Sequence, residues 1–178
     1  NYTKEKQNQF AIESYKKSIH AIESGAFKNE IVGISIKDKK NHVLFNVDEE
    51  PLKFNEQKLK TLNPAFDKNG TITAGNASSL SDGAAAVMLC SEDFKIKNNV
   101  KPIAKIIGHV SFATDPLYFT KAPIYAIQKL MKKINFDINK VDLFEINEAF
   151  SCVVMAAIDE LEIKSSKVNI NGGAVSMG

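Results

Sequence analysis

The chain has 178 residues, of which 44% are hydrophobic and 25% charged, and its formal net charge is +2. This is the composition of an ordinary soluble globular domain, and the small net charge gives no basis for binding nucleic acid or an anionic membrane. No apolar run reaches the roughly 18 residues that a membrane-spanning helix needs. Every basic residue is a lysine, so an anion site built on arginine is excluded.

The chain opens on a predicted helix from Thr3 to Glu23. Thr3 is a suitable N-cap, and Gly25 is a suitable residue to end the helix. The helix also has an apolar face whose members recur at helical spacing: Phe10, Ala11, Tyr15, Ile19 and Ile22. All three signals indicate one amphipathic helix.

A short hairpin and a polar stretch follow this helix. Residues 31–36 and 43–47 predict two strands on either side of a polar turn at 37–41. The next polar residues predict a surface loop with one short helix over 57–62, and Asn69-Gly70 predicts a tight turn. An irregular and polar first half of this kind is typical of a lid or an insertion.

The second half of the chain alternates strands with helices. Strands are predicted at residues 85–89, 103–110, 141–146 and 168–170. Helices are predicted after a Ser91 cap, over 123–133 and over 148–161. This alternation predicts an α/β fold with a layered core.

Cys90 and Cys152 are the only cysteines in the sequence. They fit neither a metal-ligand spacing nor a disulfide framework, which favours a reducing compartment. Each lies in an apolar run, so we expect both to be buried structural thiols rather than nucleophiles.

Asn147 lies where a predicted strand meets the next helix. Ligand sites in α/β folds gather at the carboxyl ends of strands, and an amide there can donate a hydrogen bond to a developing oxyanion or hold a water. The alternative is that Asn147 is simply the helix N-cap, which its spacing suits well. Glu148 could act as an acid or base, but in a first helical turn its charge would mainly favour the helix dipole.

Residues 73–79 contain no side chain larger than asparagine. Such a loop lets a ligand approach the backbone, and its carbonyl groups can bind a cation. The alternative is a tightly packed turn. Gly172-Gly173 leaves the same two possibilities open, since a glycine pair suits either a close approach to a site or an ordinary loop.

Three motifs in a fixed order carry a resemblance to a known family. They are TAGNASSLSDGAAAV at residues 73–87, EINEAF at 145–150 and NINGGAVSMG at 169–178. With the opening helix and the APIYA segment at 122–126, they resemble the thiolase family along essentially the whole chain. The likeness is greatest to its acetyl-CoA C-acetyltransferases (acetoacetyl-CoA thiolases) of the mitochondrial, potassium-responsive kind. It implies a thiolase-like layered α/β/α/β/α fold with an irregular α+β lid.

The resemblance implies three parts. Residues 1–80 would form a CoA-binding lid (loop) domain, 81–101 the last strand and helix of the N-terminal core, and 102–178 the first part of the C-terminal core. The family's nucleophilic cysteine falls before Asn1, and its histidine and second cysteine fall after Gly178. The chain is therefore expected to be an internal segment that is inactive alone and exposes apolar strand edges.

The activity implied for the parent enzyme is acyl transfer. Two acetyl-CoA molecules would join in a Claisen condensation to acetoacetyl-CoA, and the reverse reaction would be a thiolysis. A cysteine thiolate takes up the acyl group, and a second cysteine removes an α-proton from the acceptor. The alternatives are a degradative 3-ketoacyl-CoA thiolase with longer substrates and a non-catalytic acyl-CoA-binding relative.

The resemblance also implies the ligands and the setting of the parent enzyme. CoA and acetyl-CoA would be substrates, no prosthetic group would be needed, and a potassium ion would be bound. The protein would be a homo-oligomer, a dimer or homotetramer, with neither nucleic acid nor membrane as a partner. It would act in lipid metabolism at an intracellular location, mitochondrial or cytoplasmic.

Site residues are carried over onto matching positions only. Asn147 resembles the family's asparagine that orients a water in an oxyanion hole. The residues implied in CoA and acyl binding are Tyr15, Lys53, Phe54, Asn55, Ser78, Phe119 and Phe150. Among them, residues 53–55 match the lid segment that contacts CoA, Ser78 matches a serine at the pantetheine, and the last two phenylalanines match the wall of the acyl pocket.

The implied potassium ligands are Tyr15 and the carbonyl groups of Ala74, Gly75, Ala77 and Val175. Gly75 departs from the alanine that is usual in the family. Because the ligand would be a backbone carbonyl, we expect this departure to have little effect.

Overall fold

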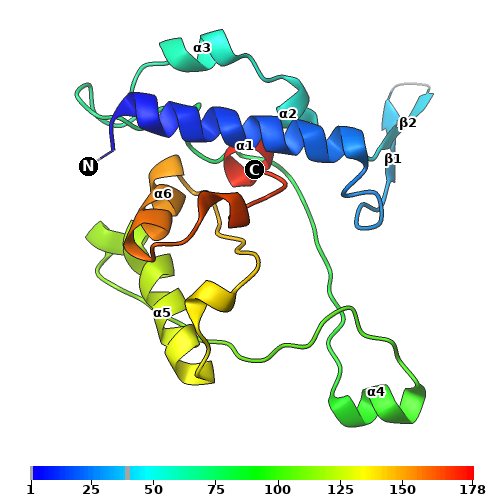
Figure 1. Ribbon diagram of the computed structural model, residues 1–178. Coiled ribbons are helices and arrows are strands. Elements are labelled where there is room, and N and C mark those ends of the chain that lie inside the picture. The colour runs from blue at the N-terminus through cyan, green and yellow to red at the C-terminus, as the bar shows by residue number, and fades with distance from the viewer. Residues whose placement is uncertain (1, 39–40) are drawn as a thin grey trace.

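The computed structural model describes residues 2–38 and 41–178 of the chain. Its longest element is helix α1 (Lys4–Ser24), which crosses the molecule. Figure 1 shows the short helices α2 (Glu49–Leu52) and α3 (Glu56–Thr61) on one side of α1 and α6 (Ser151–Glu160) on the other. The last helix, α7 (Ala174–Met177), contacts both α1 and α2, so the end of the chain lies beside its beginning.

Helix α1 confirms the first predicted element. The Thr3 hydroxyl accepts a hydrogen bond from the backbone N–H of Lys6 at 3.3 Å, and Gly25 ends the helix at a left-handed φ of 73°. Its buried face differs from the predicted apolar one. The residues buried along α1 are largely small or polar: Gln7, Asn8, Ala11, Ile12, Ser14, Ser18 and Ala21. Short side chains on this face let the neighbouring segments approach the helix closely.

Two hydrophobic clusters hold the molecule together. One packs Ile124 of α5 (Ala122–Ile134) and Val154 of α6 against Phe144, Ile146 and Val168. The other is smaller and joins α1, α3 and α7 through Ala11, Ile12, Leu59 and Val175. The second cluster fixes α3 and α7 onto α1.

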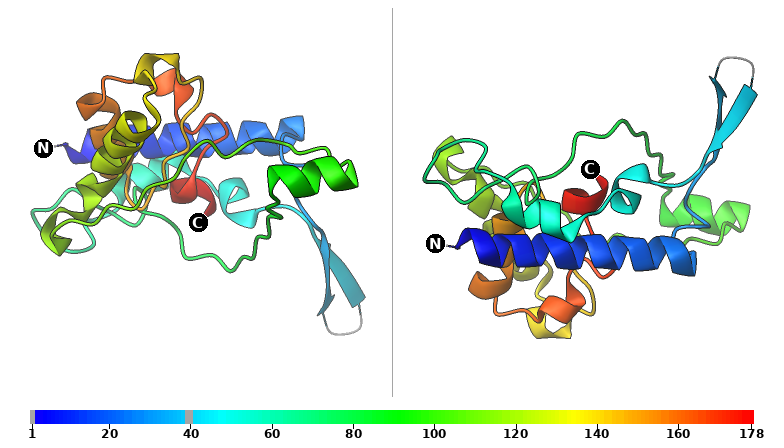
Figure 2. Two further views of the ribbon diagram at one scale, coloured as in Figure 1. Left: turned by 90° about the horizontal axis from the view of Figure 1, so that it is seen from below. Right: turned by 90° about the horizontal axis from the view of Figure 1, so that it is seen from above.

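The regular sheet among the described residues is a hairpin of β1 (Ile34–Asp38) and β2 (Asn41–Phe45). The strands are antiparallel, with Ile34 opposite Phe45 and Ile36 opposite Val43. Both predicted strands are therefore confirmed, with shifted ends, whereas residues 39–40 of the predicted turn lie outside the described residues. Figure 2 shows the hairpin projecting beyond the end of α1.

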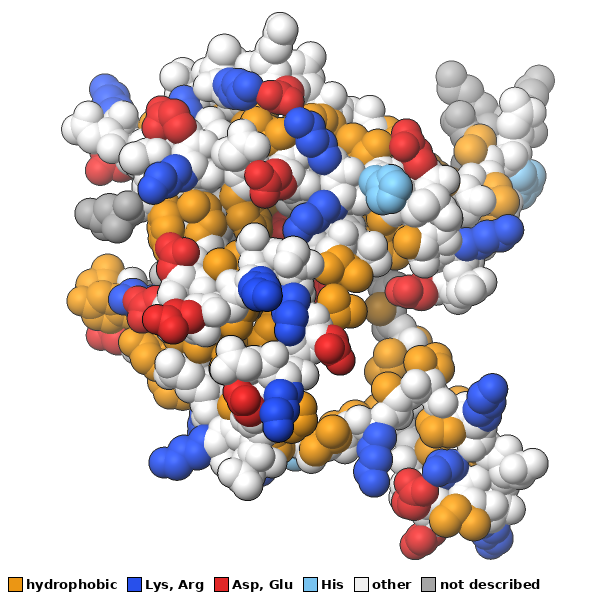
Figure 3. All heavy atoms as spheres, in the orientation of Figure 1, with side chains coloured by type: hydrophobic (Ala, Val, Ile, Leu, Met, Phe, Trp, Pro, Cys, Tyr) orange, Lys and Arg blue, Asp and Glu red, His pale blue; other side chains and the backbone are white. Residues whose placement is uncertain are grey.

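The predicted strands of the second half form only in part. Segments 141–146 and 168–170 meet in one parallel bridge, between Phe144 and Val168. Segments 85–89 and 103–110 are largely exposed and form no strand, because no strand among the described residues pairs with them; α5 contacts only the end of the second, where Lys133 donates to the His109 carbonyl at 2.9 Å. Cys90 is exposed at the end of the first of them, so its predicted burial is wrong. Figure 3 shows hydrophobic side chains on the surface in this region, near α4.

The remaining helices follow their local sequence signals. Helix α4 (Glu92–Asn98) begins at the predicted Ser91 cap, whose hydroxyl accepts from the Phe94 N–H at 3.1 Å. Helix α5 has Pro123 in its first turn, as predicted. Short 3₁₀ helices cover Pro116–Lys121, Ile138–Lys140 and Ser165–Lys167. None of the described helices combines the length and apolar character needed to cross a bilayer.

Candidate active site

The three sequence motifs meet in space. The Ser78 N–H donates to the carbonyl of Ala149 at 3.0 Å, and the Ser151 N–H donates to the carbonyl of Asn76 at 2.9 Å. These bonds flank a bridge between Ala77 and Phe150. The Ser79 N–H in turn donates to the carbonyl of Ala174 at 3.3 Å. The loop at 73–79 therefore lies between the 145–150 and 169–178 motifs and binds both through its backbone.

Asn76 holds the loop onto α1. Its side chain is fully buried, where its oxygen accepts from the Thr73 N–H at 2.9 Å and its amide nitrogen donates to Asn8 Oδ1 at 3.0 Å. It also donates to the carbonyl of Thr71 at 3.1 Å. The sequence signal for this role is weak, because the residue is one polar side chain in a run of small ones. The packed-turn alternative for this run is correct as far as Asn76 is concerned.

An open pocket of about 150 Å³ lies between α1, the short helices α2 and α3, and this loop. We call it the lid pocket, and it is lined by Tyr15, Glu50, Lys53, Phe54, Asn55, Lys58, Leu59, Leu62, Ala74 and Gly75. All three lid residues predicted to bind CoA are in this group, and so are three of the five positions predicted to hold a cation. Gly75 is packed closely: a Cβ there would lie 2.8 Å from Leu59 and 2.9 Å from Leu62.

Tyr15 and Phe54 form one wall of the lid pocket. Their rings stack with centroids 4.7 Å apart and an interplanar angle of 14°. Burial raises the pKa of the Tyr15 hydroxyl; the nearby Ser79 side chain offsets part of this rise, and the Glu50 carboxylate makes a smaller contribution that raises the pKa. Tyr15 is therefore a neutral phenol at physiological pH and can offer its oxygen to a cation or a ligand.

Two lysines place positive charge at the rim of this pocket. Lys53 forms an exposed ion pair with Glu50 at 2.7 Å, and this hydrogen bond raises the pKa of the lysine. Lys58 adds a second ammonium group to the pocket lining. Asn55 is the N-cap of α3: its side-chain oxygen accepts a hydrogen bond from the Lys58 N–H at 2.9 Å.

Phe119 and Phe150 come together as the sequence suggests. Their ring centroids lie 6.3 Å apart, and Phe150 also meets Phe66 edge to face at 6.1 Å. Phe119 and Phe66 remain exposed, so the three rings form an open aromatic surface rather than a closed core. Phe66 is a residue that the sequence reasoning missed, because no spacing relates it to the other two.

Asn147 is exposed, and no hydrogen bond joins its side chain to another residue of the described parts of the chain. Helix α6 begins at Ser151, with Phe150 in the cap position, so the alternative that Asn147 is the helix N-cap is wrong. Its neighbours in the sequence, Ile146 and Glu148, are both buried. The amide of Asn147 is thus displayed to solvent between two anchored residues.

Glu148 is not in the first turn of a helix, because α6 starts three residues later than predicted. Its carboxylate is 1% exposed and accepts a hydrogen bond from Ser14 Oγ at 2.7 Å. The Val175 N–H and the Asn169 side chain donate to it as well. Sequence reasoning missed this cluster, since its members lie far apart in the chain.

The predicted cation ligands are neutral oxygen atoms. Tyr15, Ala74 and Gly75 line the lid pocket, and Val175 belongs to the hydrophobic cluster against which Tyr15 packs. Across residues 2–38 and 41–178, no three His, Cys, Asp or Glu side chains come together as metal ligands. Carbonyl and phenol oxygens suit an alkali cation better than a transition metal.

Neither cysteine belongs to the lid pocket. Cys152 lies half-buried within α6, and burial raises the pKa of its thiol, which disfavours the thiolate that a nucleophile needs. Cys90 lies on the exposed extended segment before α4. The predicted burial of Cys152 is met only in part, and its non-catalytic role stays a prediction.

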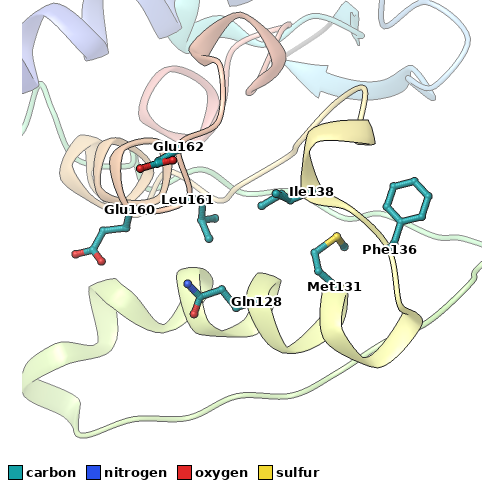
Figure 4. Close-up of a pocket in the computed structure, with 7 residues that line it drawn as sticks. All are labelled: Gln128, Met131, Phe136, Ile138, Glu160, Leu161 and Glu162. Atoms are coloured by element: carbon teal, nitrogen blue, oxygen red, sulfur yellow. The ribbon is translucent and has the colours of Figure 1, made fainter.

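Two other hollows contain none of the predicted site residues. One of about 350 Å³ lies between α5 and α6, where Gln128 and Met131 of α5 face Leu161 and Ile138 (Figure 4). The other, of about 520 Å³, lies between the end of α1 and the base of the hairpin and is lined mainly by apolar residues, among them Ile22, Phe27 and Leu44.

Comparison with known proteins gives two family matches. Residues 1–93 match "Thiolase, N-terminal domain", and residues 100–178 match "Thiolase, C-terminal domain". The acetyl-CoA acetyltransferase of Yarrowia lipolytica is 46% identical over 176 residues, which are 99% of this chain and 44% of that protein. The mitochondrial acetyl-CoA acetyltransferase of Bos taurus is 44% identical over 180 residues, covering 100% of this chain and 43% of that protein. The chain thus spans less than half the length of these relatives.

Solved structures agree with these matches. The Acat5 thiolase from Ascaris suum, in complex with coenzyme A, superimposes with a TM-score of 0.94 at 41% identity over 99% of this chain and 45% of that one. Human mitochondrial 3-ketoacyl-CoA thiolase superimposes with the same TM-score at 37% identity, again over 99% and 45% of the two chains. The layered fold predicted from the sequence is confirmed by this similarity.

Proposed function

Because this chain belongs to the thiolase family, we propose that the polypeptide that carries it is an acetyl-CoA C-acetyltransferase. It joins two molecules of acetyl-CoA into acetoacetyl-CoA and catalyses the reverse thiolysis. By the family resemblance, the two cysteines and the histidine that this chemistry requires would lie in the polypeptide outside these 178 residues.

The observation that carries the proposal is the meeting of the three motifs. Residues 73–79 bind both 145–150 and 169–178 through backbone hydrogen bonds, the latter two are joined by the Glu148 and Asn169 side chains, and Ala74 and Gly75 of the loop line the lid pocket. A chance match of small-residue motifs would not bring them to one place. The names of the relatives, which are acetyl-CoA acetyltransferases, point to the same activity.

We assign the oxyanion role to Asn147. Its exposed amide can orient a water or donate directly to the oxygen that gains negative charge in the transition state. Two features support this role: the side chain is free of hydrogen bonds to the described residues, and the buried residues on either side hold its backbone in place.

CoA would bind across the lid pocket. Lys53 and Lys58 offer ammonium groups to phosphate oxygens, Phe54 offers an apolar face, and Asn55 offers the amide nitrogen that its capping bond leaves free. Ser78, in the central loop, would meet the pantetheine. The Ascaris suum thiolase, solved in complex with coenzyme A, supports this ligand class.

The aromatic surface would wall the acyl group. Phe119 and Phe150 carry this role, and Phe66 is added on its contact with Phe150. The preference for acetoacetyl-CoA over longer substrates rests on the family resemblance at Tyr15 and Phe119.

A potassium ion would be held by Tyr15 and by the carbonyl groups of Ala74, Gly75, Ala77 and Val175. Tyr15, Ala74 and Gly75 line the lid pocket. The backbone hydrogen bonds on either side of Ala77 use the carbonyl of Asn76 and the N–H of Ser78, so they do not use the carbonyl of Ala77. When bound, the ion would order the loop that separates the lid from the core. No prosthetic group is needed for this chemistry.

The remaining features are proposals of the same kind. Residues 1–80 form the lid domain, 81–101 complete the N-terminal core and 102–178 begin the C-terminal core. The enzyme assembles as a homo-oligomer, a dimer or homotetramer, and serves lipid metabolism. The proposed location is intracellular, mitochondrial or cytoplasmic, and the mitochondrial relative from Bos taurus supports the intracellular part.

The test is the substrate preference of the complete polypeptide. Rates of thiolysis are measured with acetoacetyl-CoA and with a long-chain 3-ketoacyl-CoA, each with free CoA as acceptor. The proposal expects a clear preference for acetoacetyl-CoA. A long-chain preference would establish the second candidate, a degradative 3-ketoacyl-CoA thiolase, which the fit to the human mitochondrial enzyme supports. No turnover with either substrate would point to a non-catalytic acyl-CoA-binding relative.

A further inference from the structure

Glu148 is a buried carboxylate next to the proposed catalytic amide. It follows Asn147 directly in the chain, is 1% exposed and is not among the residues that line the lid pocket. A carboxylate is costly to bury unless hydrogen bonds replace its water shell. Its partners therefore indicate what this residue does.

Three donors from separate parts of the chain converge on this carboxylate. Ser14 Oγ donates to Oε2 at 2.7 Å, the Val175 N–H donates to the same oxygen at 3.1 Å, and Asn169 Nδ2 donates to Oε1 at 2.9 Å. Ser14 lies on α1, Asn169 follows the bridge at Val168, and Val175 is in α7. One side chain thus joins α1 and both ends of the 169–175 segment.

Asn169 anchors the residue on the other side of Asn147. Its backbone is in the left-handed region, with a φ of 46°. Its side-chain oxygen accepts from the Ile146 N–H at 2.8 Å, and its amide nitrogen donates to the Ile146 carbonyl at 2.8 Å. The same amide group therefore reaches the residues before and after Asn147.

The turn at Gly173 packs directly on the Glu148 carboxylate. A Cβ at residue 173 would lie 2.4 Å from Glu148 Cδ and 2.6 and 2.7 Å from its two oxygens. The Gly173 N–H donates to Ser14 Oγ at 3.1 Å, and the same hydroxyl donates to Glu148. The glycine at position 173 therefore allows a close approach of the backbone to the Glu148 side chain.

We propose that Glu148 is a positioning residue for catalysis: its carboxylate fixes the exposed amide of Asn147 relative to the backbone of the 173–175 turn. This inference rests on the proposed function, in which that amide meets the reacting oxygen. A role confined to folding would lower the melting temperature and leave kcat of the folded enzyme unchanged. A positioning role lowers kcat with little change in KM, because a displacement of about 1 Å can cost about 100-fold in rate.

The first variant is Glu148→Gln in the complete polypeptide. Glutamine keeps the size of the side chain, but its NH₂ group cannot accept a hydrogen bond. If the NH₂ group takes the place of Oε2, it faces the Val175 N–H, which is also a donor. If it takes the place of Oε1, it faces the Asn169 amide nitrogen, another donor, which already donates to the Ile146 carbonyl. The readouts are kcat and KM for thiolysis of acetoacetyl-CoA, the melting temperature, and hydrogen exchange of the Val175 backbone amide.

A matched pair of serine variants keeps the test open if the glutamine variant does not fold. Ser14→Ala removes one donor to Glu148, whereas Ser151→Ala removes an equally buried hydroxyl that has no hydrogen-bond partner within the described residues. We expect Ser14→Ala to lower kcat roughly tenfold, because it removes a hydrogen bond to the charged carboxylate of Glu148. It should also speed exchange at Val175 and leave KM within about twofold. Ser151→Ala should change none of these.

The outcomes separate this inference from the proposed function. If the complete polypeptide has no thiolysis activity, the proposed function is wrong, and so is the positioning role of Glu148 in that reaction. An active enzyme overturns the positioning role alone if folded Glu148→Gln keeps its kcat, or if Ser14→Ala cannot be told from Ser151→Ala. A fall in kcat with faster exchange at Val175 in both Glu148→Gln and Ser14→Ala supports it.

Discussion

Asn76, Ser14 and Glu148 are buried polar side chains, and each is satisfied by hydrogen bonds to distant parts of the chain. Such groups carry a large penalty when unpaired, so their geometry is more sharply defined than that of apolar contacts. At the candidate site they add to the backbone hydrogen bonds that join the 73–79 loop to its neighbours. The position of the site residues therefore depends on these individual hydrogen bonds as well as on packing.

The amide of Asn147 is predicted to act in catalysis and not in folding. Asn147→Ala in the complete polypeptide should lower kcat by about 100-fold, the effect of losing one oxyanion donor, with KM little changed. The melting temperature should stay the same, because the side chain is exposed and unbonded within the described residues. Steady-state kinetics and thermal melts check this, with Asn98→Ala on the remote helix α4 as the control. A variant that loses stability but keeps kcat would contradict the assignment.

Gly173 is predicted to tolerate no side chain. Gly173→Ala should destabilise the protein by about 1–3 kcal/mol, because the added methyl group would press on the Glu148 carboxylate. Gly83→Ala is the matched control, since a Cβ there meets no atom within 4 Å. Denaturant unfolding of both variants gives the measurement, and equal midpoints would show that the turn has room to move.

The lid pocket rests on two very short helices, α2 and α3. Helices of this length are not stable alone in water, so they depend on caps and on packing against the core. For α3, the cap is Asn55 and the packing residue is Leu59, which lies in the cluster with Ile12 and Val175. The lid is thus attached to the same cluster that joins α1 and α7.

Asn55 is predicted to serve both the helix and the ligand. Asn55→Ala should cost about 1 kcal/mol of stability by removing the cap, and Asn55→Ser should restore it, because serine caps helices well. If the amide also contacts CoA, the KM for CoA should rise in both variants. Unfolding curves and the KM for CoA separate the two roles, and a KM raised only in the alanine variant would leave capping as the sole one.

Local sequence signals predicted those elements whose stabilising contacts are local. Helices α1, α4 and α5 carry their caps and first-turn prolines in the sequence, and all three form where expected. The segments at 85–89 and 103–110 have strand composition, but a strand needs a neighbour, and none of the described residues supplies one. For α6, the acidic Glu148 resembled a first-turn residue, whereas its true partners lie on α1 and around α7.

The candidate site was predictable to the same extent. Lys53, Phe54 and Asn55 do share one pocket with Tyr15 and Gly75, and Phe119 does meet Phe150. The Glu148 cluster could not be predicted, because Ser14 lies 134 residues away from it in the sequence. Short motifs predict the local backbone conformation. They do not predict which buried hydrogen-bond donor will pair with which acceptor.

The molecule as a whole exposes apolar side chains along its extended segments. Val87 and Met88 are 87% and 94% exposed, and Ile103 is fully exposed. They lie close in sequence to helix α4, which stands apart from the rest of the molecule (Figure 1). Contiguous apolar surface of this kind promotes association.

The 178-residue chain alone is therefore predicted to associate in solution. The double variant Met88→Lys, Ile103→Lys should lower its association and its binding of a hydrophobic dye. Leu52→Lys, at a single exposed apolar residue on α2, should change neither. Sedimentation velocity and dye fluorescence provide the measurement. A monomeric chain that melts cooperatively without these substitutions would contradict the prediction.

Hydrogen bonds between Asn169 and Ile146 and between Glu148 and Val175 connect the segment 146–148 to the segment 169–175 at two points. The number of residues between the ties is fixed on each side, so an insertion or deletion within either segment would move one partner out of reach of the other. The exposed residues 164–166 carry no such tie and leave the connection between the segments free to change in length. Length variation in this protein should therefore be tolerated at residues 164–166 and rejected between Lys167, whose carbonyl accepts from the Phe144 N–H, and Val175.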